Sequence, residues 1–382
     1  MTRPSPVLFL CLFASQAGLL VLSPVLPDVA REFGVSTAMA GQLRSLSGLA
    51  GGATAVLLAM ASRRPGLRDL LTAGALLLGA GSALSAAAPS FAVLAVAQGV
   101  AGIGVGLLVA AGIAAAGEWP EAADRPAVLA WAIAGMPAAW ITGMPAVGVL
   151  AGVSWRAAWL VPAVVGLATA ALVRRRPKDH ASSSSARPVG AWRNPDVARF
   201  AFGELLANAA WASVLTYSGA LLLDSYGLSP ALVAFGLGGM AVAMVPGTFL
   251  ARRHAARATP ALLGGLTAFQ AAAVVVLGEL RPSPGVTLCV LAAMAFVNGW
   301  RSMVASAFGM DAAPEDRVAA MSMRAAANQF GYLLGAAAGG LALALAGFAG
   351  LGIALGCMFA AAVLVHVPAL LPGGPVSAPA RP

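Results

Sequence analysis

The sequence has few charged residues. Asp, Glu, Lys and Arg make up only 10% of its 382 residues, whereas hydrophobic residues make up 60%. A soluble domain needs about a quarter of its residues charged to cover its surface. The composition therefore excludes a soluble enzyme, a disordered chain and a nucleic-acid-binding domain. The net charge of +9 does not alter this, because the basic residues separate apolar runs and do not gather on one solvated face.

Lysine and cysteine are also scarce. The one lysine, Lys178, does not lie in a loop of the form Gly-x4-Gly-Lys-Ser/Thr, so the chain cannot drive transport with ATP through such a loop. The three cysteines lie in apolar segments and have neither a disulfide framework nor metal-ligand spacing. The three histidines fall in loops or at a helix end. We therefore expect no metal, no cofactor and no enzymatic activity.

Long apolar runs fill most of the chain. A bilayer core about 30 Å thick needs about 20 apolar residues per helix, and twelve such runs are present. We predict an all-α membrane protein with twelve transmembrane helices and short loops. The predicted spans are residues 6–27, 38–61, 69–88, 91–116, 126–150, 156–173, 197–223, 230–251, 259–279, 285–311, 317–346 and 348–371.

Basic residues determine the predicted orientation, because loops rich in Lys and Arg resist translocation. With the N-terminus inside, seventeen basic residues fall in cytoplasmic segments. Only Arg31, Arg156 and Arg281 fall in external loops. We therefore predict a multi-pass protein of the cell (inner, cytoplasmic) membrane with both termini in the cytoplasm.

The longest polar break divides the chain near its midpoint. It begins at Arg174 with Arg-Arg-Arg-Pro-Lys-Asp-His and includes serines at 182–185, a composition typical of a flexible linker. Six helices on each side, and Arg pairs after helices two and eight, indicate two pseudo-symmetric bundles as in secondary transporters. The predicted domains are an N-terminal six-helix bundle (1–173), a cytoplasmic linker (174–196), a C-terminal six-helix bundle (197–371) and a cytoplasmic tail (372–382).

Two helices carry recognisable motifs. In the first, Gly18 is followed by Pro24-Val-x-Pro27, and two prolines three residues apart bend or terminate a helix. The fifth contains Gly143-Met-Pro145-x-x-Gly148, in which small residues permit close helix packing and the proline weakens the backbone ladder. Trp-Arg follows at 155–156. We expect a hinge at the external mouth and a flexible fifth helix.

With these motifs the chain resembles the major facilitator superfamily, in particular its twelve-helix drug:proton antiporter branch. The resemblance implies that the fifth helix packs against a helix of the other half, and that helices 1, 4, 7 and 10 line a central cavity. Two positions depart from the family pattern. Ser62 replaces an Asp beside Arg63 in the loop after helix two, and Gln98 replaces an Arg often assigned to proton handling. Since Gln98 cannot ionise, the coupling ion stays open.

Polar residues on the four cavity helices are the predicted transport site, since a charge at bilayer depth is costly unless it is paired or wetted. Glu204, Asn208 and Trp211 have i, i+4 and i+7 spacing and share one helix face. The candidates for the substrate cavity are Gln16, Gln98, Glu204, Asn208, Trp211, Tyr217, Asn298 and Arg301.

Several of these charges have predicted partners. At about 1.5 Å per residue, Glu204 and Arg301 lie about 10 Å and 15 Å from their cytoplasmic helix ends, so they can form an ion pair. Its strength would change with protonation or substrate, unless it is a static lock. Arg44 is expected to pair with Asp28 across the external mouth, and Arg324 to extend to the cytoplasmic surface. Glu204 and Asp28 are the proton-coupling candidates. The candidates for gating and helix packing are Pro24, Pro27, Arg44, Arg63, Gly143, Pro145 and Gly148.

The resulting hypothesis is a monomeric secondary transporter in the lipid bilayer. We expect export of a small organic compound or drug in exchange for protons, by alternating access. The alternative is a symporter or facilitator that imports a small anion or sugar, which the missing arginine at Gln98 favours.

Overall fold

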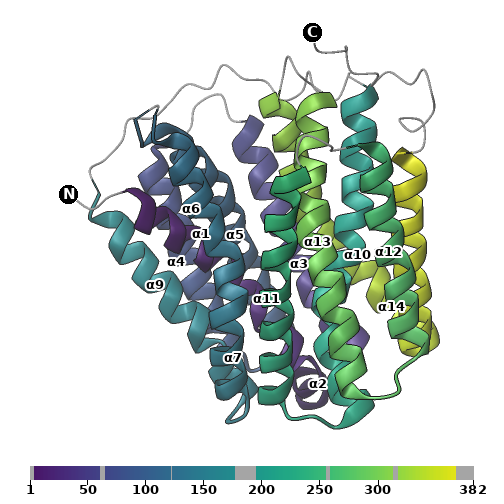
Figure 1. Cartoon of the computed structure of the whole chain (residues 1–382). Coiled ribbons are helices and arrows are strands. Elements are labelled where there is room, and N and C mark those ends of the chain that lie inside the picture. The colour runs from purple at the N-terminus through teal and green to yellow at the C-terminus, as the bar shows by residue number, and fades with distance from the viewer. Residues whose placement is uncertain are drawn as a thin grey trace. The chain divides into compact units, whose positions relative to one another are not determined.

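The computed structural model describes residues 4–60, 65–121, 123–176, 195–254, 259–312 and 317–366. In these ranges the regular structure is entirely helical (Figure 1). The helices are α1 Pro4–Leu20, α2 Leu22–Phe33, α3 Thr37–Met60, α4 Leu67–Ala86, α5 Phe91–Glu118, α6 Arg125–Ala138, the π-helical η1 Ala139–Gly143, α7 Met144–Ala151, α8 Trp155–Ala158, α9 Leu160–Arg174, α10 Pro195–Tyr226, α11 Pro230–His254, α12 Pro260–Glu279, α13 Pro284–Ala312 and α14 Arg317–His366.

Among the described residues, 10 segments are long and apolar enough to cross a membrane. Helix α3, with 24 residues, is also long enough. Helix α14 has 50 residues and is two helices joined at Ala346 and Gly347, which leave the helical conformation. Gly347 has φ 62, a left-handed conformation that glycine adopts readily. The predicted break between residues 346 and 348 is therefore confirmed.

The first span bends but does not stop at its prolines. The chain bends at Val21, where α1 passes into α2, because Pro24 cannot donate to the carbonyl of Leu20. The helix then continues through Pro27 to Phe33 and ends at Gly34, which has φ 64. The predicted end at residue 27 is thus wrong. The two donors missing at Pro24 and Pro27 are tolerated because a helix still satisfies the rest of the backbone in an apolar environment.

The fifth span contains the irregularity that its sequence predicts. The π-helical segment η1 lies between α6 and α7 and ends two residues before Pro145. A π-turn widens the helix and accommodates a residue whose backbone donor is missing. The proline motif thus produces a local change of helix geometry without interrupting the span.

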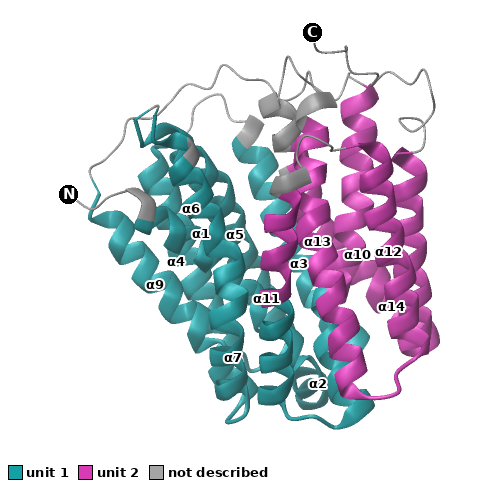
Figure 2. Cartoon of the chain, in the orientation of Figure 1, with its two compact units in different colours: residues 1–186, 215–241 teal, residues 187–214, 242–382 magenta. Residues whose placement is uncertain are grey.

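The described chain forms two compact units, coloured in Figure 2. Unit 1 contains residues 1–186 and 215–241, and unit 2 contains residues 187–214 and 242–382. The units therefore differ from the predicted bundles in the placement of residues 215–241. Most of the predicted linker, residues 177–194, and the predicted tail lie outside the described residues. The division into two six-helix bundles stays a prediction.

Close backbone approaches explain why residues 215–241 belong to unit 1. The N–H of Gly219 donates to Ser23 Oγ at 3.2 Å, and a Cβ added at Gly219 would contact the Ser23 carbonyl. The ring of Tyr217 packs against Gly41 in the same way. Small residues are what permit helices to approach this closely. The last part of α10 (215–226) and the first part of α11 (230–241) are therefore packed into unit 1.

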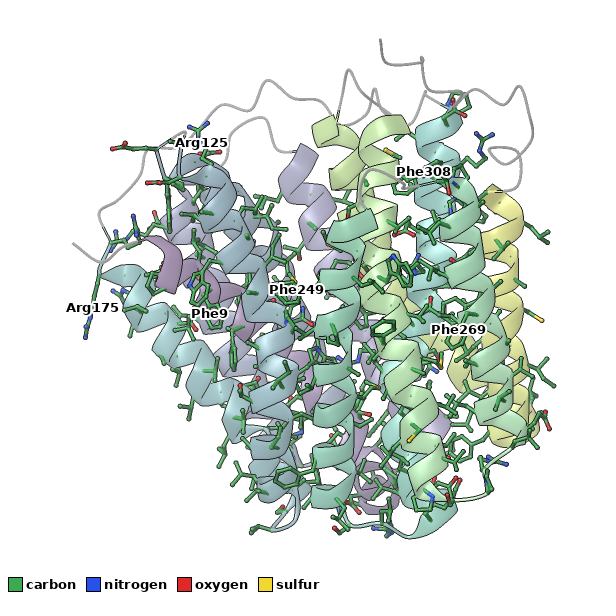
Figure 3. The ribbon with its side chains drawn as sticks, in the orientation of Figure 1. Phe9, Arg125, Arg175, Phe249, Phe269 and Phe308 are labelled. Atoms are coloured by element: carbon green, nitrogen blue, oxygen red, sulfur yellow. The ribbon has the colours of Figure 1, made fainter. Side chains whose placement is uncertain are left out.

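Basic side chains lie at the end of unit 1 where α1 begins. Figure 3 labels Arg125 and Arg175 at this end. Arg68 lies there too, and its Nη2 donates to the carbonyl of Arg174 at 2.6 Å. The positive-inside rule counts such Lys and Arg residues, not the net charge.

The opposite end of unit 1 holds paired charges. Asp28 accepts a hydrogen bond from Arg31 at 2.7 Å, and Glu32 accepts one from Arg156 at 2.5 Å. Arg156 Nη1 also donates to the carbonyls of Ala86 and Ala88 at 3.1 and 2.8 Å. The two arginines here are therefore neutralised by neighbouring carboxylates.

Candidate functional site

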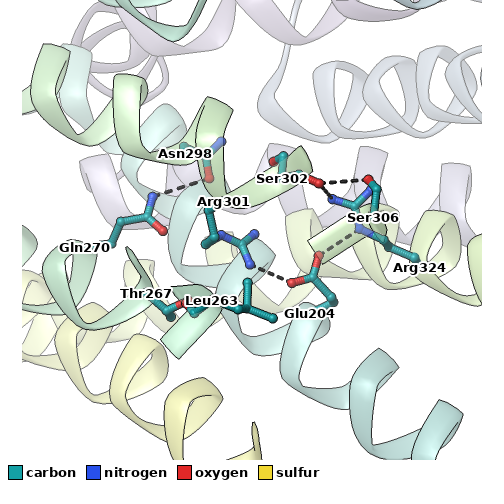
Figure 4. A network of polar contacts seen from close by, with 9 residues as sticks. All are labelled: Glu204, Leu263, Thr267, Gln270, Asn298, Arg301, Ser302, Ser306 and Arg324. Carbon is teal, nitrogen blue, oxygen red and sulfur yellow. Dashed lines mark hydrogen bonds and ion pairs between the residues drawn. The ribbon is translucent and has the colours of Figure 1, made fainter. Parts of the chain in front are cut away.

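A cluster of three charged side chains lies inside unit 2 (Figure 4). Glu204 of α10 is fully buried. Its Oε1 accepts a hydrogen bond from Arg301 Nη1 of α13 at 2.6 Å, and its Oε2 accepts one from Arg324 Nε of α14 at 2.9 Å. The predicted contact between Glu204 and Arg301 is confirmed. We call these three residues the charged cluster.

Arg324 does not extend to the surface as predicted. Its Nε binds Glu204, its Nη2 donates to the carbonyl of Ser302 at 3.0 Å, and its side chain is 19% exposed. A buried carboxylate needs partners for both oxygens, and a single arginine that uses one nitrogen supplies only one. Arg324 therefore turns inward, a direction that depth along a helix does not reveal.

Arg301 is bonded on one side only. Its side chain is 1% exposed, and Nη1 donates to Glu204. Its Nε and Nη2 are buried and have no acceptor among the described residues. Because two guanidinium groups face one carboxylate, the charged cluster carries a formal net charge of +1.

An amide pair continues the cluster along α13. Asn298 precedes Arg301 by three residues and therefore shares its helix face. Gln270 of α12 donates from Nε2 to Asn298 Oδ1 at 3.3 Å, and its own Oε1 is buried without a donor among the described residues. Gln270 is not among the predicted site residues, although an amide residue within a long apolar run is a signal that the sequence contains.

The end of α14 packs against α10 beside Glu204. His366 is 3% exposed, and its ring lies 6.4 Å from Phe200 and 6.2 Å from Phe308 between centroids. A Cβ added at Gly203 would lie 2.5 Å from His366 Nε2. This histidine, expected at a helix end, is thus buried against α10.

The polar face of α10 is directed at α14. Glu204 binds Arg324, and a Cβ added at Gly331 would lie 3.0 Å from the Cβ of Asn208. Trp211, the third residue of the predicted face, is half-buried. Glu204 and Asn208 therefore share a face, as the i, i+4 spacing predicts.

The candidates in unit 1 form neutral hydrogen bonds. Gln98 Nε2 of α5 donates to Ser85 Oγ of α4 at 2.9 Å. Gln16 Oε1 accepts from Trp140 Nε1 at 3.2 Å. Tyr217 is 1% exposed and packs against Gly41. Gln98 thus bridges two packed helices, and its role in a substrate cavity stays a prediction.

The predicted pair between Arg44 and Asp28 is wrong. Arg44, which is 2% exposed, donates from Nη2 to the carbonyl of Leu19 beside the bend at Val21. Asp28 instead pairs with Arg31, one helical turn further on. A bend exposes backbone carbonyls that a buried guanidinium can satisfy, whereas a carboxylate near a helix end finds a partner on its own helix.

The gating and packing candidates lie at close contacts within unit 1. Pro24 and Pro27 are buried in α2. A Cβ added at Gly143 would lie 2.8 Å from Leu20 Cδ1, and one at Gly148 would contact Ala234 Cβ of α11. Pro145 Cδ lies 3.4 Å from a Cβ added at Gly238. The fifth span therefore packs against α11 within unit 1, and its packing against the other half stays a prediction. Arg63 lies outside the described residues.

Many apolar spans and a buried charged cluster define a polytopic membrane protein of the transporter class. A family model described as Major Facilitator Superfamily matches residues 8–319. The chain therefore belongs to the Major Facilitator Superfamily and is a transporter of small molecules, not an enzyme.

One similar protein is the chloramphenicol resistance protein of Streptomyces lividans, 28% identical over 282 residues, which cover 69% of this chain and 72% of that protein. Three solved structures share the fold. They are a D-xylose-proton symporter (TM-score 0.74, 16% identity, covering 95% and 96% of the two chains), a bacterial homologue of the human lysosomal transporter Spinster, inward-facing and occupied (0.71, 16%, 97% and 96%), and the nucleoside transporter NupG (0.73, 14%, 96% and 99%).

Proposed function

We propose that the chain exports a small organic compound in exchange for protons, by alternating access between its two halves. The observation that carries this proposal is the buried carboxylate of Glu204 between two guanidinium groups. A charge at this depth is costly and is a functional candidate by default. The similarity to a chloramphenicol resistance protein supports export of a drug-like cargo.

Proton binding at Glu204 would change how α10 is held. Ionised Glu204 attracts Arg301 from α13 and Arg324 from α14. A protonated carboxyl group keeps one hydrogen-bond acceptor but loses the charge that attracts both arginines. The contacts of α10 with α13 and α14 then weaken together, which is the kind of change that alternating access requires. Asp28 is the weaker coupling candidate because its partner Arg31 is 76% exposed.

The test is transport of chloramphenicol in proteoliposomes with an imposed pH gradient. Wild-type protein is expected to transport the cargo faster when protons flow down their gradient in the direction opposite to the cargo. Glu204→Gln is expected to remove that dependence. Asp28→Asn is the matched control, since it makes the same carboxylate-to-amide change at an exposed ion pair in unit 1. If Glu204→Gln folds and still responds fully to the gradient, Glu204 is a static lock and the coupling role is lost.

A second candidate is a symporter or facilitator that imports a small anion or sugar. The net charge of +1 in the charged cluster favours an anionic cargo, and one structure with the same fold is a D-xylose-proton symporter. In the same proteoliposomes a symporter moves its cargo in the direction in which protons flow, whereas an antiporter moves it in the opposite direction. Screening sugars and small anions beside chloramphenicol separates the two candidates.

We further propose two six-helix bundles, a monomeric transport unit and a location in the inner membrane with both termini in the cytoplasm. Arg125 and Arg175 support the orientation because they lie at the end of unit 1 where α1 begins. A fluorescent protein fused after residue 382 is expected to fluoresce in intact cells, as it does only when it folds in the cytoplasm. A fusion that is expressed normally but does not fluoresce would contradict the predicted orientation.

A further inference from the structure

One edge of the Arg301 guanidinium is buried and has no acceptor among the described residues. In a guanidinium group, Nε and Nη2 form the side edge, whose two N–H bonds run parallel. This edge has no acceptor among the described residues, while Nη1 is occupied by Glu204. Both atoms are buried inside a side chain that is 1% exposed. Arg301 therefore presents two parallel donors that can bind two oxygens of one ligand.

The charge of the cluster points to the sign of its ligand. Arg301 and Arg324 contribute two positive charges and Glu204 one negative charge, and all three residues are bonded to one another through Glu204. An uncompensated charge in an apolar interior is costly. A single negative charge on the free edge of Arg301 would neutralise the cluster, whereas a cation or a neutral group would not.

The shape of the edge selects among anions. Two parallel N–H groups match two oxygens of one planar group, as in arginine–carboxylate pairs. Gln270 Oε1 is buried and has no donor in the described part of the chain, and the same residue binds Asn298, three residues before Arg301. A ligand that also carries a hydroxyl or N–H donor could satisfy this oxygen.

We propose that the charged cluster binds a monovalent planar oxyanion, through the side edge of Arg301. Glu204 holds the opposite side of the same guanidinium and so orients this edge. The oxyanion is either a small free ion or the carboxylate of a larger organic molecule. This inference rests on the cluster of the proposed function but does not depend on the direction of transport.

The test is anion binding to the full-length protein in detergent. Thermal unfolding is recorded while sodium methanesulfonate is replaced by sodium nitrate, acetate or benzoate at constant sodium concentration. Wild-type protein is expected to show a saturable rise in Tm. A response to nitrate and acetate identifies a site for free small anions, and a response to benzoate alone identifies a site for an organic carboxylate.

Variants give opposite signs. Arg301→Gln is expected to raise the half-saturating anion concentration by about tenfold or more, because it removes the charged donor pair. Glu204→Gln leaves the two arginines without a competing carboxylate. It is expected to lower the half-saturating anion concentration by about tenfold. Arg31→Gln is the control, since Arg31 also pairs with a carboxylate but is exposed.

Absence of a saturable rise with all three anions overturns the proposal, as does Arg301→Gln with wild-type affinity. If Arg301→Gln does not fold, Glu204→Gln decides: unchanged or weaker binding overturns the proposal. Because binding is measured without transport, a failed transport assay with normal anion binding would count against the proposed function alone.

Discussion

Helices α5 and α13 bury polar side chains in different ways. In unit 1, Gln98 of α5 forms a neutral bond to Ser85, and Ser85 in turn donates to the Gly81 carbonyl at 2.8 Å. In unit 2, Arg301 of α13 binds the carboxylate of Glu204, and two of its nitrogens have no acceptor among the described residues. In the first arrangement Gln98 Nε2 and Ser85 Oγ both have partners, whereas in the second Nε and Nη2 of Arg301 stay available to a ligand.

This difference separates a packing interaction from a functional one. A buried ion pair adds little net stability, because desolvation offsets the attraction of the charges. The neutral bond between Gln98 and Ser85 is sufficient to join two helices. The charged cluster is therefore better explained by ligand or proton binding than by stability, and substitutions can test this contrast.

The largest effect is expected from Glu204→Leu. It leaves Arg301 and Arg324 without their carboxylate, and removal of one partner from a buried pair costs about 3–5 kcal/mol. The free energy of unfolding, measured by denaturant titration of the purified protein, should fall by this amount. The double variant Glu204→Leu with Arg301→Leu should recover much of the loss, and equal instability of both variants would contradict the account.

The second effect concerns the packing that brings Arg324 to Glu204. A Cβ added at Gly335 of α14 would contact the backbone carbonyl of Ala209, whereas one at Gly265 of α12 meets nothing within 4 Å. Gly335→Ala should destabilise the protein by about 1–3 kcal/mol, the usual range for overpacking.

The matched change Gly265→Ala removes the helix penalty of glycine and should be neutral or stabilising by up to about 1 kcal/mol. Thermal unfolding of both variants gives the comparison. Equal effects would show that α10 and α14 do not need this close approach.

A smaller effect is expected for Gln98→Leu. The loss of one neutral hydrogen bond costs about 0.5–1.5 kcal/mol, and Ser85 keeps its bond to Gly81. Its response to a pH gradient in proteoliposomes should equal that of wild-type protein. A Gln98→Leu protein that folds but loses the response would move the coupling site into unit 1.

The smallest effect is expected for Asp28→Asn. Its pair with Arg31 is an exposed i, i+3 contact, worth about 0–1 kcal/mol. Both the unfolding temperature and the gradient response should stay near wild-type values. A clear loss of gradient response would instead favour Asp28 over Glu204 as the coupling residue.

The sequence was sufficient for features that depend on distance along a helix. The break at Ala346 and Gly347 follows from the length of an apolar run that exceeds one span. The contact between Glu204 and Arg301 follows from similar depth on neighbouring helices. Both predictions use only the rise per residue and the cost of buried charge.

Features that depend on helix rotation or packing could not be predicted. Arg324 turns inward because a second oxygen of Glu204 is available, and this requires knowing which face of α14 meets α10. Arg44 binds the Leu19 carbonyl because a bend lies beside it. The membership of residues 215–241 in unit 1 depends on close approaches such as that of Gly219 to Ser23. None of these is encoded in hydropathy.

The net charge of the charged cluster makes the site sensitive to membrane voltage. Moving one elementary charge through 100 mV is worth about 2.3 kcal/mol. With Glu204 ionised, the ligand-free cluster carries +1 through whatever part of the field it crosses, while a cluster holding a monovalent anion carries none. If the proposed anion binds, a conformational step taken without it moves charge through the field, whereas the anion-loaded step moves none.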